Sequence, residues 1–193
     1  QKKFVYGLVE KNKPQIVEAK YIANPGCFAT AILLSLLPIQ DLLMDQTIMI
    51  SGITGATGAG LKPIETSHFV NRHDNISIYK PFNHQHLKEI NSVLELNPEQ
   101  ITFLPHRGNF NRGIYVSCTL KATESEEIIL QKFISFYAYF PQTIVLNELP
   151  NLKDVINTNL CQIGIHKQGE KLLIVAVIDN LLKGACGQAV QNM

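Results

Sequence analysis

The sequence lacks the features that would place it in a membrane, a secreted or a nucleic-acid-binding class. Its longest apolar stretch, residues 28–39, is shorter than the ~20 residues that span a bilayer, and Ser35 and Pro38 interrupt it. No apolar signal core follows Gln1-Lys2-Lys3. The formal net charge is only +1, which gives no electrostatic reason to bind nucleic acid or anionic lipid. We therefore expect a cytoplasmic protein without membrane or nucleic-acid partners.

The sequence also lacks paired cysteines. Its four cysteines stand singly, so no C-x-x-C pair indicates a zinc site or a redox centre: Cys27, Cys118, Cys161 and Cys186. They could form two disulfides, but a chain of 193 residues can build a core without them. We expect reduced thiols and no metal.

A third absence concerns nucleotide binding. No G-x-G-x-x-G follows a predicted strand, so the pyrophosphate-binding turn of a Rossmann domain is missing. The composition, with 46% hydrophobic and 17% charged residues, is nevertheless that of a globular protein. The length allows one well-cored domain, or one domain plus part of another.

The chain does contain a cysteine at a turn that opens a helix. Pro25 and Gly26 force the turn, and the apolar run after Cys27 predicts a helix that ends before Pro38. A thiol at this place faces unpaired backbone N–H groups and the positive end of the helix dipole, which favour the nucleophilic thiolate. On placement alone, a buried cysteine that only packs is an equal alternative.

The heptapeptide around Cys27, Asn24-Pro25-Gly26-Cys27-Phe28-Ala29-Thr30, resembles the nucleophile motif of N-acetyl-gamma-glutamyl-phosphate reductase, an NADPH-dependent enzyme of arginine biosynthesis. Two positions depart from that motif, because Phe28 stands where the family has Tyr and Ala29 where it has Pro. The resemblance continues in residues 4–10 and in residues 179–191. It implies that Cys27 is the catalytic nucleophile.

A glycine-rich loop over residues 51–60 follows a strand predicted over residues 47–50. Its four glycines allow a ligand to approach the backbone closely, although composition alone favours a plain flexible loop. The loop is similar to a Ser-Gly loop of the reductase family. That resemblance implies that Ser51 and Gly52 bind the cofactor at its nicotinamide end.

A histidine-rich segment opens the next predicted helix, which runs from residue 84 to residue 94. His84 and His86 are two residues apart, which is not the helical spacing of a metal-binding pair, and capping of the helix is the structural alternative. With Glu89 they match the family pattern His-x-His-x-x-Glu. The resemblance implies that His84 is the acid/base partner of Cys27 and that His86 and Glu89 position the substrate.

Two strands are predicted over residues 101–106 and 113–121, with Arg112 in the loop between them. The forked donors of Arg112 suit a carboxylate or a phosphate of the substrate, and a surface arginine in a hairpin loop is an equal alternative. In the C-terminal segment the resemblance implies that Asn180 and Gly184 lie at the cofactor, with Asn180 bonded to the nicotinamide amide.

The remaining periodicity predicts one more helix and three more strands. The helix covers residues 124–139 with Thr123 as its cap, one strand covers residues 143–146, and residues 159–166 and 171–178 form a hairpin. The fold class that the resemblance implies is α+β. The resemblance implies the C-terminal domain of glyceraldehyde-3-phosphate dehydrogenase, a mixed and mostly antiparallel sheet with helices on one face.

The resemblance also divides the chain into three parts. Residues 1–26 would be a remnant of a nucleotide-binding domain, residues 27–178 the catalytic and dimerisation domain, and residues 179–193 a helix that returns to the nucleotide-binding domain. Most of the nucleotide-binding domain would then be missing. We expect a homodimer or homotetramer, and we expect the chain alone to be inactive.

The implied reaction is the NADP(H)-dependent reduction of an N-acyl-gamma-glutamyl phosphate, a small-molecule acyl phosphate, to a semialdehyde and phosphate through a cysteine thioester. The acyl group, acetyl or succinyl, stays open. The alternatives are an aspartate-semialdehyde dehydrogenase, a Cys/His hydrolase or acyltransferase that needs no nucleotide, and a non-catalytic assembly module.

Overall fold

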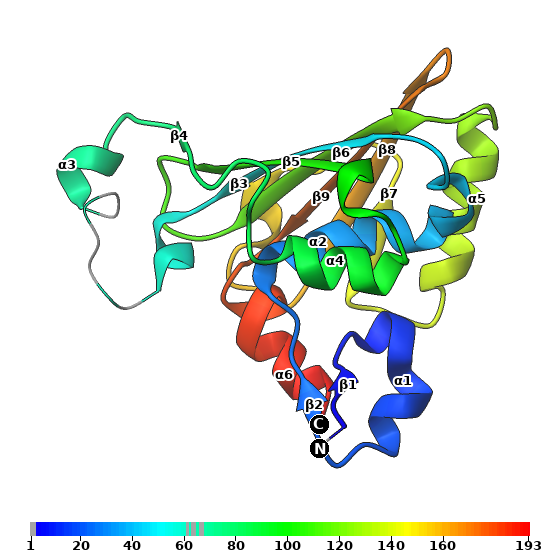
Figure 1. Ribbon diagram of the computed structural model, residues 1–193, viewed down its shortest axis with the longest axis horizontal. Helices are drawn as coiled ribbons and strands as arrows, with labels where there is room; N and C mark the ends of the chain where they lie inside the picture. Colours follow the sequence, from blue (N-terminus) through cyan, green and yellow to red (C-terminus); the bar gives the residue numbers. More distant parts are fainter. Residues whose placement is uncertain (1–2, 61, 63–64, 66–67) are drawn as a thin grey trace.

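The structure is a computed structural model that describes residues 3–60, 62, 65 and 68–193. A broad sheet carries helices beneath it, and the first and last described segments of the chain lie below these helices (Figure 1). The helices are α1 (Val9–Val17), α2 (Cys27–Leu36), α3 (Phe69–Arg72), α4 (Leu87–Leu94), α5 (Glu126–Tyr137) and α6 (Gly187–Gln191). None of the helices in these described ranges combines the length and the apolar character needed to cross a membrane.

Seven strands of the described chain form one sheet. Their spatial order is β4 (Ser77–Ile78), β5 (Ile101–Arg107), β3 (Ile48–Thr54), β6 (Ile114–Lys121), β9 (Lys171–Ile178), β8 (Cys161–Gln168) and β7 (Thr143–Leu146). The β3–β5 and β7–β8 pairs are parallel and the other four pairs are antiparallel. The sheet is thus mixed and mostly antiparallel, and the predicted α+β class is confirmed.

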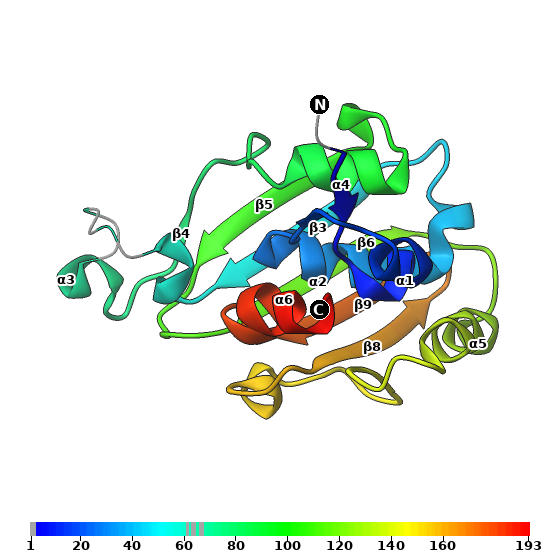
Figure 2. The ribbon, with the colours of Figure 1, turned by 90° about the horizontal axis from the view of Figure 1, so that it is seen from below.

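Helix α2 is the centre of the hydrophobic core. Every residue from Phe28 to Leu36 is buried, because the helix lies under the middle strands of the sheet (Figure 2). It contacts β6 and β9 above it and α4 beside it. Tyr137 of α5 donates its hydroxyl to the Leu34 carbonyl at 2.6 Å, so the edge of the helical layer is tied to this core. A helix that is apolar all round is expected to be buried in this way.

Strand β3 differs from its prediction. It was expected to end at Ile50, with a loop from Ser51 onward, but it continues to Thr54 because β5 and β6 pair with it along its full length. Gly52 lies inside the strand, where a Cβ would come within 2.5 Å of the Phe28 ring. The glycine therefore permits close packing of α2 against the sheet.

The neighbours of Arg112 also differ from the hairpin alternative. Strands β5 and β6 are consecutive in sequence, but β3 lies between them in the sheet, so they do not form a hairpin.

Helix α5 is capped by Ser125 and not by Thr123, because the Ser125 Oγ accepts the Ile128 N–H at 3.3 Å. The predicted β8–β9 hairpin is confirmed, with Gly169 in its turn at a φ of 59°.

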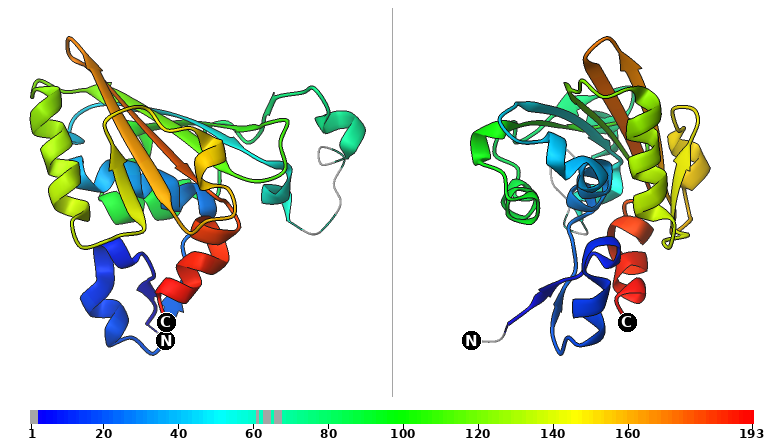
Figure 3. Two further views of the ribbon diagram at one scale, coloured as in Figure 1. Left: turned by 180° about the vertical axis from the view of Figure 1, so that it is seen from behind. Right: turned by 90° about the vertical axis from the view of Figure 1, so that its right-hand side faces the viewer.

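The chain ends form a small separate layer below the helices (Figure 3). Short strands β1 (Val5–Tyr6) and β2 (Ile22–Ala23) pair in parallel beside α1 and α6. The Gly7 carbonyl accepts hydrogen bonds from Gln188 and Asn192. A π-helical turn, residues 182–186, joins β9 to α6. The N-terminal segment is therefore bonded directly to the end of the chain.

Candidate active site

The turn before Cys27 is built from its own residues and from residues distant in sequence. Gly26 is the N-cap of α2, with an extended φ of −70° and ψ of 152°, and Cys27 is the first helical residue. The backbone N–H and the side chain of Thr30 both donate to the Gly26 carbonyl, at 2.8 and 3.1 Å. These bonds close the first helical turn and fix the direction of the Cys27 side chain.

Glu89 holds this turn from α4. Its Oε2 accepts the Gly26 backbone N–H at 3.2 Å and the Tyr6 hydroxyl at 2.9 Å. Its Oε1 lies 3.9 Å from Nε2 of His86. A Cβ on Gly26 would stand 2.3 Å from this His86 nitrogen, so only glycine fits at the position. The structure thus brings His86 and Glu89 against the residue that precedes Cys27.

His84 has different surroundings. It is 4% exposed and packs edge-on against Phe28 and Tyr79, with ring centroids 5.6 Å apart in each pair. Its Nδ1 accepts the His86 backbone N–H at 3.3 Å. Burial, with the charges of His86 and Lys80, lowers the pKa of His84 to about 4. At neutral pH His84 is a neutral ring that supports Phe28 and His86.

The electrostatics of Cys27 differ from the expectation of a stabilised thiolate. The backbone N–H groups of Phe28 and Cys27 do act in the expected direction, but burial outweighs them. Burial, with a smaller contribution from the charge of Glu89, raises the pKa of the Cys27 thiol to about 11. The residue is nevertheless half-buried and not fully enclosed. In this chain Cys27 is therefore a thiol at neutral pH.

The π-helical turn packs against Cys27. A Cβ added to Gly184 would stand 2.8 Å from the Cys27 Cβ, so the two backbones are in close contact. Asn24 donates to the Ala185 carbonyl at 3.0 Å and accepts from Asn192 at 3.0 Å. The start of the nucleophile motif and the C-terminal motif are therefore one structural unit, although more than 160 positions separate Asn24 from Ala185 in the chain.

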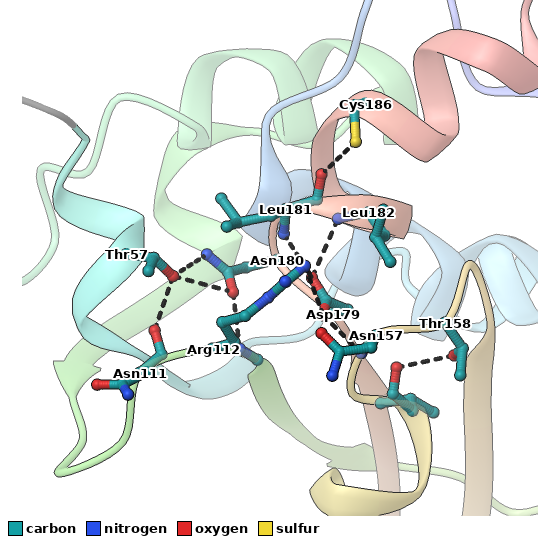
Figure 4. A network of polar contacts seen from close by, with 12 residues as sticks. Thr57, Asn111, Arg112, Asn157, Thr158, Asp179, Asn180, Leu181, Leu182 and Cys186 are labelled. Carbon is teal, nitrogen blue, oxygen red and sulfur yellow. Dashed lines mark hydrogen bonds and ion pairs between the residues drawn. The ribbon is translucent and has the colours of Figure 1, made fainter.

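Arg112 is engaged by Asp179 (Figure 4). Its guanidinium lies 3.0 Å from both carboxylate oxygens of Asp179, whose side chain is fully buried. Burial acts to raise the pKa of Asp179, but the N–H groups of Asn157 and Leu181 and the Arg112 side chain outweigh it, so the pKa lies below its ordinary value. Arg112 therefore has an internal carboxylate partner, and its expected contact with a substrate anion stays a prediction.

Asn180 is also bonded internally (Figure 4). Its Oδ1 accepts the Gly113 backbone N–H at 2.7 Å, and its Nδ2 donates to the Thr57 hydroxyl at 3.0 Å. The residue is 2% exposed. Gly113 and Thr57 thus use one lone pair of the Asn180 oxygen and one hydrogen of its amide, and the expected contact with nicotinamide stays a prediction.

The four residues expected at the cofactor lie on two segments, β3 and the chain after β9. Ser51 lies in β3 with its side chain on the sheet face opposite α2, beside Leu104 and Ser117. The Phe28 ring occupies the space beside the Gly52 Cα, so no ligand can contact the backbone from that side. Asn180 and Gly184 remain near the end of β9. The cofactor-binding roles of these four residues stay predictions.

Several site residues were missed by sequence reasoning. Tyr6 donates a hydrogen bond to Glu89, and Asp179 accepts one from Arg112. Tyr6 and Asp179 both lie in segments that resemble the reductase family, residues 4–10 and 179–191. In the part of the chain that the structure describes, no group of three or more His, Cys, Asp or Glu side chains has a metal-binding arrangement.

The comparison with protein families decides the affiliation. A family model described as "Semialdehyde dehydrogenase, dimerisation domain" matches residues 27–180. The chain belongs to this family. The match begins at Cys27, inside the first motif, and ends at Asn180, at the start of the C-terminal segment. The name of this family also connects the chain with assembly into oligomers.

Curated relatives carry the name expected from the motif. Proteins named N-acetyl-gamma-glutamyl-phosphate reductase from Azobacteroides pseudotrichonymphae and Parabacteroides distasonis are 50% and 49% identical to this chain, over 190 and 199 residues. Each alignment covers 98% of this chain. The chain spans 60% and 61% of the length of these relatives. The resemblance to the reductase family is confirmed.

Solved structures confirm the fold. The crystal structure of aspartate semialdehyde dehydrogenase II from Vibrio cholerae matches with a TM-score of 0.78 and 16% identity, over 98% of this chain and 67% of that chain. Aspartate semialdehyde dehydrogenase from Francisella tularensis matches with a TM-score of 0.72 and 16% identity, over all of this chain and 71% of that chain. At such identity the likeness concerns the fold alone. The predicted architecture, that of the C-terminal domain of glyceraldehyde-3-phosphate dehydrogenase, is confirmed.

Proposed function

We propose that this chain supplies the thiol, the acid/base group and the dimerisation surface of an N-acyl-gamma-glutamyl-phosphate reductase. The observation that carries the proposal is the Cys27 turn, where Gly26 is held by Glu89 and packed against the His86 ring. A half-buried cysteine at a helix start, with a histidine and a carboxylate at the glycine that precedes it, supports a nucleophile that gives up its proton to a nearby base. The names of the relatives supply the substrate class.

Cys27 attacks the carbonyl carbon of the acyl phosphate, the carbon–oxygen bond to phosphate breaks, and a thioester and inorganic phosphate result. The thiol proton must leave as the sulfur attacks, because the raised pKa of Cys27 keeps it protonated. His86 is the base that we assign to this step, in place of His84, since its ring contacts Gly26 while that of His84 packs between Phe28 and Tyr79. Glu89, 3.9 Å from His86, would stabilise the imidazolium that forms.

NADPH, when bound in the whole enzyme, would supply the hydride that reduces the thioester. This chain would contribute the remaining amide hydrogen of Asn180 and the backbone at Gly184. Residues 1–26 and 179–193, bonded to each other through Gly7, would form the junction with the nucleotide-binding domain. Residues 27–178 would form the catalytic and dimerisation domain, within a homodimer or a homotetramer.

The test is phosphate-dependent reduction of NADP by the full-length protein. We expect turnover with an N-acyl-glutamate semialdehyde, acetyl or succinyl, and none with aspartate semialdehyde. Cys27→Ser should abolish this turnover while the protein stays folded. Activity with aspartate semialdehyde alone would contradict the proposal and support the enzyme class of the structural neighbours.

The two histidines are tested against each other in the same assay. His86→Asn should lower kcat by roughly 10²–10⁴-fold, the range for loss of a general acid or base. His84→Asn should lower stability more than the chemical step, because His84 is enclosed by aromatic rings. The reverse order would return the acid/base role to His84.

A further inference from the structure

A buried ion pair joins α1 to the π-helical turn of residues 182–186. Lys183 Nζ donates to Glu10 Oε1 at 2.5 Å, and both side chains are fully buried. The same ammonium donates to Gln188 and Gln191 of α6, at 2.9 and 2.7 Å. All three ammonium hydrogens are thus used by one carboxylate and two amides.

Stability alone does not account for this pair. Burying two charges costs free energy that their attraction only partly returns, and apolar replacements of buried pairs are often equally stable or more stable. Here Glu10 Oε2 has no hydrogen-bond partner among the described residues, which adds to that cost. A feature this costly at a buried position is better explained by the geometry that it imposes.

The geometry that it imposes concerns Cys27. Lys183 lies within a π-helical turn, in which Gly184 donates to the Asp179 carbonyl at 3.0 Å. Such turns are rare in proteins, and those that do occur are often found at functional sites. The turn brings Gly184 so close to Cys27 that an added Cβ would stand 2.8 Å from the Cys27 Cβ. Any movement of Lys183 therefore changes the space beside the thiol.

We propose that Glu10 and Lys183 are positioning residues that hold the Gly184 backbone against Cys27 and thereby set the orientation and solvent access of the thiol. The residues touch neither the sulfur nor a substrate, and they act through the π-helical turn. The effect on turnover rests on the proposed function. The effect on the thiol does not, so the two can fail separately.

The first test measures alkylation of each cysteine by iodoacetamide at neutral pH, read by mass spectrometry. The double variant Glu10→Gln/Lys183→Met removes both charges, so no lone charge is left buried. We expect Cys27 to react about tenfold faster, as it would if its pKa fell by one unit on exposure to water. Cys118, fully buried in β6, should stay protected and so report that the protein is folded.

The matched control is Lys132→Met. It removes another lysine that bridges two carboxylates, those of Asp41 and Glu124, at a partly exposed place on α5. The Cys27 rate should not change in this variant. An unchanged Cys27 rate in the double variant, or a rise that Cys118 shares in equal proportion, would overturn the proposal, the latter because it indicates a purely structural pair.

A milder variant covers the case in which the double variant does not fold. Glu10→Gln/Lys183→Gln also leaves no lone charge buried, and its glutamine side chains keep groups that can hydrogen-bond to each other and to Gln188 and Gln191. It should shift the Cys27 rate in the same direction with Cys118 protected, and no shift would overturn the proposal. In the full-length protein we expect the folded variant to lose up to about 10²-fold in kcat with little change in KM, as for a misplaced reacting group. Were Cys27→Ser to retain turnover, the proposed function would fail while the alkylation result still stood.

Discussion

Glu89 accepts the backbone N–H of Gly26 at 3.2 Å, although the two residues lie 63 positions apart in the chain. The same oxygen accepts the Tyr6 hydroxyl. The carboxylate that the motif associated with substrate is therefore already bonded to the turn that carries Cys27. This relationship makes α4 and the N-terminal segment parts of the support of the Cys27 turn.

Replacing Glu89 should loosen that support. Glu89→Ala leaves the Gly26 N–H and the Tyr6 hydroxyl without their acceptor, and we expect a loss of about 1–3 kcal/mol in the free energy of unfolding. Glu89→Gln keeps an acceptor oxygen and should cost less. Urea denaturation followed by circular dichroism measures both, with the exposed Glu148→Ala as control. Equal stability of the Ala and Gln variants would show that the bonds to Gly26 and Tyr6 contribute little.

The pH dependence of Cys27 alkylation follows from its raised pKa. Since burial holds the pKa at about 11, the thiolate fraction should grow about tenfold per pH unit from pH 7 to pH 10, without a plateau. Iodoacetamide labelling quenched at a series of times gives the alkylation rate of Cys27 at each pH. Cys186 is exposed and serves as the internal reference, and Cys118 and Cys161 should stay unlabelled. A plateau below pH 8 would mean that the chain alone already stabilises the thiolate.

Arg112 should be important for folding as well as for any ligand. Arg112→Ala leaves the buried Asp179 carboxylate without its cation, and we expect a loss of about 2–3 kcal/mol, less than for a fully enclosed pair because water reaches the guanidinium. Lys132→Ala, which breaks a more exposed pair, should cost no more than about 1 kcal/mol. Thermal and urea unfolding compare the two. If the Arg112 variant were as stable as wild type, Arg112 would be free for substrate.

Acid should destabilise the protein partly through His84. Its pKa is about 4 when folded and 6.5 as a free side chain, so between these values the unfolded state binds more protons. Stability is therefore present above pH 6.5 and is lost as the pH falls toward 4, by up to about 3 kcal/mol. Urea unfolding at pH 7 and pH 4.5 should show a smaller difference for His84→Gln than for wild type. The exposed His166→Gln should keep the wild-type difference.

The sequence by itself determined many of the local elements and indicated the family. The apolar run after Cys27 ends at a proline, so helix α2 was predicted with its nucleophile at the first position. Alternation predicted β6, and the Gly169 turn predicted the β8–β9 hairpin. These signals depend on neighbouring residues only, and the motif around Cys27 was sufficient to indicate the family.

Tertiary structure alone decided how these elements meet and what surrounds the thiol. Strand β3 separates β5 from β6, because sheet order depends on pairing between distant segments that no local pattern encodes. Arg112 pairs with Asp179, which lies 67 positions away in the chain, and Glu10 pairs with Lys183, which lies 173 positions away. The pKa of Cys27 was expected to fall because the helix start was visible in the sequence. The pKa rises because the sulfur is buried by several elements that pack around it, and this packing forms only in the folded chain.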